Sequence, residues 1–393
     1  MTPAARVQSA IELLDKVIEA ARTKGAPADR ILAEWFRANR FAGSKDRRAI
    51  RELVYGAIRA CGPVPRSGRA AMLRLAEADP ALAALFDGSQ YGPTPIGPGE
   101  EPAEGGIGPD WLEAALAASD IAGPETVALL ERAPLDIRVN TLKADRATIS
   151  LPAEARAIEA PNGLRLPSGT SVEQWPAYQD GLVEVQDGGS QLACEAVGAR
   201  PGETVIDLCA GAGGKTLALA AAMGNAGTLI AADTDRGRLS RLGPRAERAG
   251  ALVAETVLLD PGRELDALTS WRGKADAVLV DAPCSGSGTW RRNPEARWRL
   301  TPGDLERFAR DQAQLLEIAK ELVRPGGRLV YVICSLLDAE GAAQADAFLA
   351  ANPGWRADPP ALPLGVARGQ GVRLTPFRDG TDGFFIARMQ KPC

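Results

Sequence analysis

The sequence predicts an α/β protein whose second half forms a doubly wound, mostly parallel sheet. From about residue 200, short strand-like runs alternate with helical stretches, which is the pattern of a parallel sheet covered on both faces. Acidic or thiol side chains follow these runs, at the sheet edge where open α/β sheets bind ligands. The chain has 393 residues, 45% of them hydrophobic, which is enough for two or three domains.

The predicted strands of this sheet are mainly apolar, and each has a polar residue near or just after its end. They are Thr204–Cys209, Thr228–Asp233, Val253–Leu259, Ala275–Val280 and Arg328–Cys334, with a final strand at Gly383–Met389. The polar residues that they bring to one edge are Asp207, Asp233, Asp260, Asp281 and Cys334.

The residues before the sheet divide into three parts. Apolar residues at helical spacing predict an all-helical domain over 1–87, followed by a linker over 88–109, where 12 of 22 residues are Gly or Pro. Two short helices and the alternating strand Leu135–Thr141 predict a small α+β RNA-binding subdomain over 110–183. The catalytic domain is then expected over 184–393.

Composition excludes several kinds of chemistry. The chain contains no histidine, so serine-hydrolase triads and histidine metal sites are ruled out, and proton transfer must use other side chains. None of the six cysteines forms a C-x-x-C pair, and we expect no metal. No apolar run is long enough to cross a membrane and no signal pattern begins the chain, so we expect a cytoplasmic protein.

Charge is distributed unevenly along the chain. The net charge is −4, yet residues 1–86 hold 15 Lys/Arg against 9 Asp/Glu, a charge of +6. A basic front end on an acidic body is consistent with contact to a polyanion such as RNA, although a solvated helical surface has the same composition.

A Gly-rich loop follows the first predicted strand in Asp207-Leu-Cys-Ala-Gly-Ala-Gly-Gly-Lys-Thr and opens a helix. The Walker A pattern fails because Cys209 stands where its first glycine belongs, and the dinucleotide pattern fails because the spacing is G-x-G-G. A loop that binds S-adenosylmethionine (SAM) remains. Asp233, 26 residues after Asp207, stands where an acid would bind the ribose hydroxyls.

A more specific motif, Asp281-Ala-Pro-Cys-Ser-Gly-Ser-Gly, follows the fourth strand, and a second thiol, Cys334, ends the fifth. An acid and two cysteines beside a SAM loop suit methylation at carbon 5 of a pyrimidine. That carbon is too weak a nucleophile unless a thiolate first adds to carbon 6, and an acid at ring nitrogen 3 stabilises the adduct. A free thiol has a pKa of about 8.5, so the nucleophile needs help, for which Lys215 is available. Spacing leaves open whether Cys284 or Cys334 attacks.

Residues 184–390 resemble the RsmB/Nop/Sun family of RNA cytosine-5 methyltransferases, which have a Rossmann-like class I fold. The matching pieces are Gln186-Asp187 with Ser190-Gln191, the 207–216 loop, Ala232-Asp233, Asp260, Asp281–Gly286, Cys334-Ser335 and Asp382–Phe384. The resemblance implies that Cys334 is the nucleophile and that Cys284 aids product release. DNA cytosine methyltransferases instead attack with the cysteine at the Cys284 position. It also implies SAM contacts from Cys209, Ala210, Gly211, Ala212, Gly213, Gly214, Lys215, Asp233, Asp260 and Asp281.

Two segments are further candidates for RNA contact. Ser44–Arg59 resembles a helix of NusB-like RNA-binding domains, which bacterial RsmB-like proteins carry in front of their catalytic domain. Leu135–Lys143 resembles the family segment before catalysis, with Arg138 and Asn140 on its polar face. The stretch Thr289–Arg299 combines arginines with tryptophans, a composition of single-strand RNA sites, and its candidates are Trp290, Arg291, Arg292 and Arg297.

The sequence therefore predicts a monomeric SAM-dependent methyltransferase that modifies carbon 5 of a cytosine in RNA, with small-subunit ribosomal RNA as the substrate. One alternative is a family member that acts on tRNA or on another ribosomal site. An alternative of another class is a non-catalytic RNA-binding assembly factor.

Overall fold

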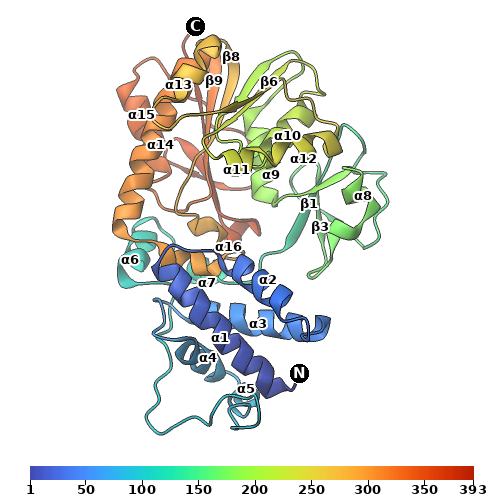
Figure 1. Ribbon diagram of the computed structural model, residues 1–393. Coiled ribbons are helices and arrows are strands. Elements are labelled where there is room, and N and C mark those ends of the chain that lie inside the picture. The colour runs from blue at the N-terminus through green and yellow to red at the C-terminus, as the bar shows by residue number, and fades with distance from the viewer. The chain divides into compact units, whose positions relative to one another are not determined.

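The computed structural model describes residues 1–393, which form two compact units (Figure 1). The first unit contains Met1–Arg132 and, from much later in the chain, Thr289–Pro302. The second unit contains Ala133–Gly288 and Gly303–Cys393. The predicted division of the chain into four segments stays a prediction. Residues 110–132, however, group with the first unit and not with the strands that follow them.

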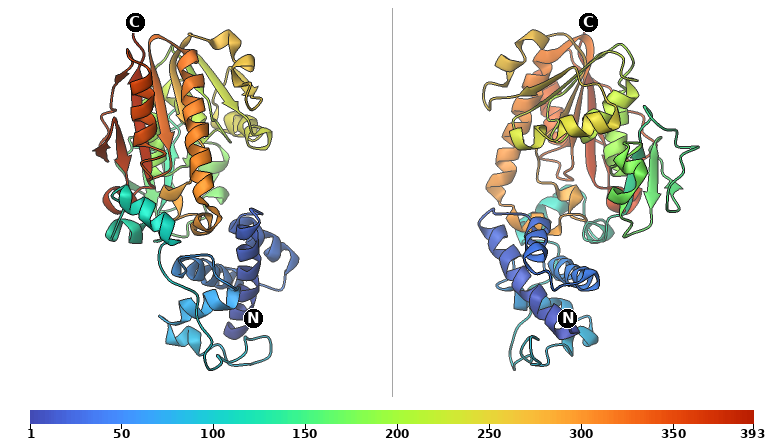
Figure 2. Two further views of the ribbon diagram at one scale, coloured as in Figure 1. Left: turned by 90° about the vertical axis from the view of Figure 1, so that its left-hand side faces the viewer. Right: turned by 45° about the vertical axis from the view of Figure 1, so that its right-hand side comes forward.

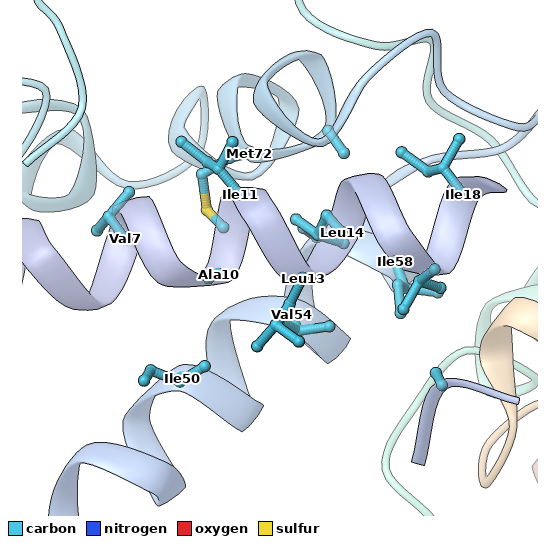
Figure 3. Close-up of a cluster of buried hydrophobic side chains, with 14 of the residues drawn as sticks. Val7, Ala10, Ile11, Leu13, Leu14, Ile18, Ile50, Val54, Ile58 and Met72 are labelled. Atoms are coloured by element: carbon cyan, nitrogen blue, oxygen red, sulfur yellow. The ribbon is translucent and has the colours of Figure 1, made fainter. Parts of the chain in front are cut away.

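The first unit is helical, and its core lies between its longer helices. Figure 3 shows Leu14 of one helix, Ile58 of a second and Met72 of a third among the buried side chains. Trp298 from the returning segment belongs to the same core. The helices are α1 (Pro3–Arg22), α2 (Ala28–Ala38), α3 (Ser44–Ala60), α4 (Gly68–Ala76), α5 (Pro80–Ala83), α6 (Asp110–Ala118) and α7 (Pro124–Ala128), with the 3-10 turn η4 (Pro294–Arg299).

The Gly/Pro-rich segment 88–109 contains no helix or strand, as its composition predicts, but it is attached to the helices. Ala103 N donates to Ala70 O at 2.9 Å, and Gly62 N donates to Glu104 O at 3.0 Å. Arg69 also pairs with Glu100. The segment therefore packs back on the first unit and is not a free linker.

The second unit begins with a small antiparallel sheet in the order β2-β3-β1-β4. Its strands are β1 (Leu135–Val139), β2 (Arg156–Ala157), β3 (Gly163–Leu166) and β4 (Val183–Val185). The short helix α8 (Pro176–Gln179) precedes β4, and α9 (Gly188–Val197) leads into the main sheet.

The main sheet has nine strands, with the path β11-β12-β13-β9-β8-β5-β6-β7 and β10 paired to β13. Strands β9, β8, β5, β6 and β7 are mutually parallel, whereas β10 to β13 pair antiparallel. Their bounds are β5 (Thr204–Asp207), β6 (Thr228–Asp233), β7 (Glu255–Leu258), β8 (Ala275–Asp281), β9 (Val323–Ile333), β10 (Arg356–Ala357), β11 (Val366–Arg368), β12 (Gly371–Leu374) and β13 (Phe384–Gln390).

Alternate residues along these strands belong to two separate cores. Val205 and Leu279 pack with α9, α10 and α12, while Ile206 and Val278 pack with α14 and α15 on the opposite face. In the left view of Figure 2, α14 and α15 lie in front of the sheet. The helices are α10 (Gly214–Ala222), α11 (Arg236–Leu239), α12 (Leu242–Ala249), α13 (Glu264–Ala267), α14 (Pro302–Leu322), α15 (Ala342–Ala351) and α16 (Pro376–Asp379).

The predicted α/β class with a helical front end is confirmed, and the five predicted parallel strands are all present. The carboxyl ends of β5, β6, β8 and β9 bring Asp207, Asp233, Asp281 and Cys334 to one edge. No helix is both long enough and apolar enough to span a membrane.

Candidate active site

The Gly-rich loop between β5 and α10 is fixed by Asp233 at the end of β6. Gly211 N and Asp235 N each donate to a different carboxylate oxygen of Asp233 at 2.7 Å. Gly211 has a φ of +55° and its Cβ would lie 2.4 Å from the Arg238 guanidinium, while Gly213 has a φ of +87°. Side chains at these positions would be strained, so the glycines are needed for this loop shape.

Asp207 precedes this loop in the sequence, and its side chain stabilises the loop. Its carboxylate is fully buried and accepts a hydrogen bond from Thr216 Oγ1 at 2.7 Å, which ties the end of β5 to the first turn of α10. Burial raises the pKa of Asp207 to about 7, with smaller opposing effects from Thr216 and Lys215. Asp207 therefore supports the loop from below and is too buried to contact a ligand.

A cavity of about 530 Å³ opens at this edge of the sheet. That volume is within the range of small-molecule sites. Of the predicted site residues, it brings together Cys209, Asp233, Asp281, Cys284 and Cys334. Sequence reasoning missed other residues that line the cavity, among them Thr234, Asp235, Arg238, Glu264, Asp311, Gln314 and Leu315.

Some predicted cofactor residues lie beside the cavity and do not form its wall. Asp260 is exposed, and its neighbours Leu259 and Pro261 line the cavity instead. Five residues of the Gly-rich loop do not line the cavity, which are Ala210, Gly211, Ala212, Gly213 and Gly214. They adjoin it through Cys209, which precedes them, and through Asp233, which accepts a hydrogen bond from Gly211 N. The spacing of an acid after each strand locates the right edge, but it does not tell which of two adjacent residues faces the ligand.

Lys215 and Asp281 form an ion pair between the start of α10 and the end of β8. Lys215 Nζ donates to Asp281 Oδ2 at 2.6 Å and lies 5.7 Å from the centre of the Phe384 ring. Burial, the largest single effect, lowers the pKa of Lys215, but the charge and hydrogen bond of Asp281 together with Cys194 and Cys334 outweigh it, and the net pKa is raised. The ammonium therefore remains protonated beside Asp281.

The two thiols predicted to act together are in direct contact. Cys284 Sγ and Cys334 Sγ are 3.4 Å apart, and both residues line the cavity. The hydrogen bond to Cys334, together with burial and the charge of Glu340, holds the pKa of Cys284 well above its usual range. Cys284 is therefore a thiol that can donate its S–H to Cys334.

The predicted RNA contacts on β1 stay a prediction that the structure does not support, because both side chains are buried within the second unit. Arg138 is 5% exposed and its Nε donates to Gln186 Oε1 at 2.7 Å. Asn140 is 2% exposed and donates to the carbonyls of Gly181 and Ala249. Both side chains donate to internal acceptors.

Most of the predicted contacts in Thr289–Arg299 likewise stay unsupported predictions, because this segment packs into the first unit. Trp290 and Arg297 are fully buried and Arg291 is 5% exposed. Arg297 donates to the carbonyls of Ile58 and Cys61 at the end of α3, where the helix dipole favours a cation. Arg292 is half-buried and is the one member of the group with accessible surface.

Residues 195–390 match the sequence model of the family described as 16S rRNA methyltransferase RsmB/F. The chain is 34% identical over 303 residues to a Synechocystis protein named probable ribosomal RNA small subunit methyltransferase B, covering 72% of this chain and 66% of that protein. The chain belongs to the RsmB/F methyltransferase family. A Thermus thermophilus protein, ribosomal RNA small subunit methyltransferase B, is 40% identical over 211 residues, covering 53% of this chain and 50% of its own length.

The solved structures agree with this placement. A methyltransferase homolog protein from Pyrococcus horikoshii has a TM-score of 0.58 and 29% identity, covering 68% of this chain and 90% of its own. The chain spans about two thirds or less of the length of the two curated relatives above.

S-adenosylmethionine is the cofactor of this methyltransferase family, and the residues present fit it. The nine-residue helix α10 has no side-chain cap at its N-terminus, so its first N–H groups can bind a carboxylate. Asp233 lines the cavity beside that terminus and keeps acceptor capacity for ribose hydroxyls. Leu259, Pro261 and Leu315 supply apolar surface for an adenine.

Proposed function

We propose that this protein transfers a methyl group from S-adenosylmethionine to carbon 5 of a cytosine in small-subunit ribosomal RNA. The observation that carries the proposal is the contact of Cys284 with Cys334, 3.4 Å apart at the edge of a cavity that Asp281 also lines. A SAM site alone would suit many acceptors. Two adjacent thiols beside an acid suit a pyrimidine carbon that must be activated by covalent addition.

In this mechanism Cys334 is the nucleophile. Its sulfur adds to carbon 6 of the cytosine, and the Asp281–Lys215 pair binds the N3 edge of the ring, where negative charge develops. The cofactor supplies the electrophilic methyl group that carbon 5 then accepts. After loss of the carbon-5 proton, Cys334 leaves, and Cys284, which is a protonated thiol 3.4 Å from it, aids this release.

The cofactor would be held by the Gly-rich loop and the two ends of the cavity. Backbone N–H groups at the start of α10 would bind its carboxylate, and Asp233 would bind its ribose hydroxyls. The apolar side chains of Leu259 and Pro261 would flank its adenine. Asp260 lies on the exposed turn between these two residues and would contact the cofactor at the rim of the cavity.

RNA binding is assigned to the first unit, at the junction of α2 and α3. Phe41 is 67% exposed there, and it packs edge-on against Trp35 with ring centres 6.3 Å apart. An exposed ring beside unpaired cations is a platform for a base next to its phosphates. The end of α2, the segment after it and the first half of α3 carry exposed basic residues that form no ion pair, which are Arg37, Arg40, Lys45, Arg48 and Arg51. We call these five residues and Phe41 the α2–α3 patch.

The proposal is tested by incubating the protein with S-adenosylmethionine and either small-subunit ribosomal RNA or total tRNA, followed by bisulfite sequencing. We expect one cytosine of the ribosomal RNA to become resistant to conversion and no cytosine of tRNA to do so. Resistant cytosines found only in tRNA would show that tRNA, and not ribosomal RNA, is the substrate. SAM binding with no resistant cytosine in either RNA would contradict carbon-5 chemistry.

A further inference from the structure

One buried carboxylate beside the thiols has no part in the mechanism described so far. Glu340 lies between β9 and α15 and is fully buried. Its Oε2 accepts hydrogen bonds from Ser285 Oγ at 2.5 Å and Ser335 Oγ at 2.6 Å. Its Oε1 accepts one from Ser285 N at 2.8 Å and one from Gln312 Nε2 at 3.3 Å. No cation is among these partners, so neutral donors alone stabilise the charge.

The donors come from the two loops that carry the thiols. Ser285 directly follows Cys284 and Ser335 directly follows Cys334. The two loops are joined further by Gly288 N, which donates to Cys334 O at 3.0 Å. A single carboxylate therefore binds the backbone or side chain next to each sulfur, and it fixes the loops at the spacing that gives the 3.4 Å contact between the sulfurs.

Two other elements hold Glu340 from behind, one through its carboxylate and one through its backbone carbonyl. Gln312 of α14 donates both to Glu340 and, at 2.9 Å, to Pro283 O. Tyr331 of β9 donates its phenol hydrogen to Glu340 O at 2.6 Å. A carboxylate held by donors from three elements has one available position, which is what a group that sets a distance between two loops requires.

The charge of Glu340 acts on Cys284. The titratable groups that face Cys284 are Cys334, Glu340 and the phenol of Tyr331, and none of them is a cation. Cys334 instead faces Lys215, whose ammonium is paired with Asp281. The negative charge of Glu340 and the absence of a facing cation favour the thiol form at Cys284.

We propose that Glu340 is a positioning residue that assigns different roles to the two thiols. It holds the Cys284 and Cys334 loops in contact and keeps a negative charge beside Cys284, so that Cys334 is the sulfur that attacks. This inference rests on the proposed function, because it concerns the thiols of that same site.

The test compares Glu340→Gln, which removes the charge, with Glu340→Asp, which keeps the charge but shortens the side chain. Alkylation of each cysteine by iodoacetamide is followed by peptide mass spectrometry at pH 8. We expect Cys284 to react about 10-fold faster in Glu340→Gln, the effect of a pKa lower by about one unit, and at the wild-type rate in Glu340→Asp. Single-turnover methyl transfer to RNA should fall about 10-fold to 100-fold in both variants, because the loops lose their spacing.

Two further measurements separate positioning from simple stability. SAM affinity should be unchanged in both variants, because Glu340 does not line the cavity. Glu184→Gln is the matched control, since Glu184 is a buried carboxylate of the same unit, 2% exposed, that is bonded to Arg245 and Arg248 and not to the thiol loops. This control should alter stability without altering alkylation of Cys284.

Wild-type alkylation of Cys284 and wild-type methyl transfer in folded Glu340→Gln would overturn the inference. If that variant does not fold, Ser335→Ala decides, because it removes one donor and keeps the charge: transfer should slow while Cys284 reacts normally, and an unchanged transfer rate would refute the positioning role. A wild-type protein that methylates no RNA would overturn the proposed function, whereas the alkylation of Cys284 would still report on Glu340.

Discussion

Replacing Asp233 by alanine should both loosen the Gly-rich loop and weaken cofactor binding, and the two effects can be measured separately. Asp233 is 7% exposed and accepts two backbone hydrogen bonds of 2.7 Å, from Gly211 and Asp235. A hydrogen bond to a charged group contributes about 1.5–3 kcal/mol. Because water can enter the cavity, we take the lower value for each bond and expect the free energy of unfolding to fall by about 3 kcal/mol.

The ribose hydroxyls would lose a charged acceptor in the same variant. Loss of about 1.5–3 kcal/mol of binding free energy raises the dissociation constant for SAM about 10-fold to 150-fold. Isothermal titration calorimetry measures this constant, at a temperature where circular dichroism shows that the variant is folded. Asp233→Asn should give a smaller loss on both scales, because its amide keeps one acceptor oxygen.

The matched control for this experiment is Asp79→Ala in the first unit. Asp79 also accepts two backbone hydrogen bonds, from Ala81 N at 3.0 Å and Leu82 N at 3.2 Å, but it lies outside the cavity. It should leave SAM affinity unchanged. An Asp233→Ala protein that is less stable but binds SAM with the wild-type constant would refute the ribose role and leave Asp233 as a support for the loop.

Two other outcomes follow from the charges. Burial raises the pKa of Asp207 to about 7. Above about pH 4 the folded protein therefore keeps a proton on this carboxyl group that the unfolded chain releases. This group makes the protein less stable as the pH rises from about 4 to 7. Asp207→Asn should therefore gain stability relative to wild type by up to about 4 kcal/mol between pH 4 and pH 8 in urea titrations, and a pH-independent difference would contradict the raised pKa. In the α2–α3 patch, the double variant Arg40→Ala/Arg48→Ala should weaken RNA binding. It should also reduce the slope of log affinity against log salt concentration by about 0.7 to 0.9 for each phosphate contact that is lost. Phe41→Ala should weaken RNA binding without changing this slope. Arg66→Ala is the control, because Arg66 is a 60% exposed arginine of the same unit that pairs with Glu101. An equal effect from this variant would show that RNA binding depends on the overall positive charge of the unit and not on the patch.

The sequence predicts the sheet well because both faces of its strands are buried. Runs such as Ala277–Val280 are apolar throughout, and the acid or thiol after each run must lie at one edge once the strands are parallel. Strands β11 and β12 of the antiparallel edge are only three and four residues long, so their sequence pattern is too short to identify them.

The RNA contacts and Glu340 could not be predicted for a different reason. Whether an arginine binds phosphate or a carbonyl depends on what lies across from it, and the partner of Arg297, Ile58, is 239 residues away. Deleting residues 1–86 would likewise expose Trp298, so point variants of the patch test RNA binding more cleanly than truncation. Glu340 shows no pattern in the sequence, because its role depends on two loops that only the folded sheet brings together.

The central claim is that Cys334 attacks the cytosine while Cys284 aids release, and the covalent intermediate tests it directly. Wild type, Cys284→Ala and Cys334→Ala are incubated with SAM and small-subunit ribosomal RNA for a time long enough for a single turnover, then separated on a denaturing gel. Cys284→Ala should transfer the methyl group and remain bound to RNA as a slowly migrating conjugate, while Cys334→Ala should be inactive and form no conjugate. A conjugate in Cys334→Ala, and none in Cys284→Ala, would exchange the roles of the two thiols and contradict the account.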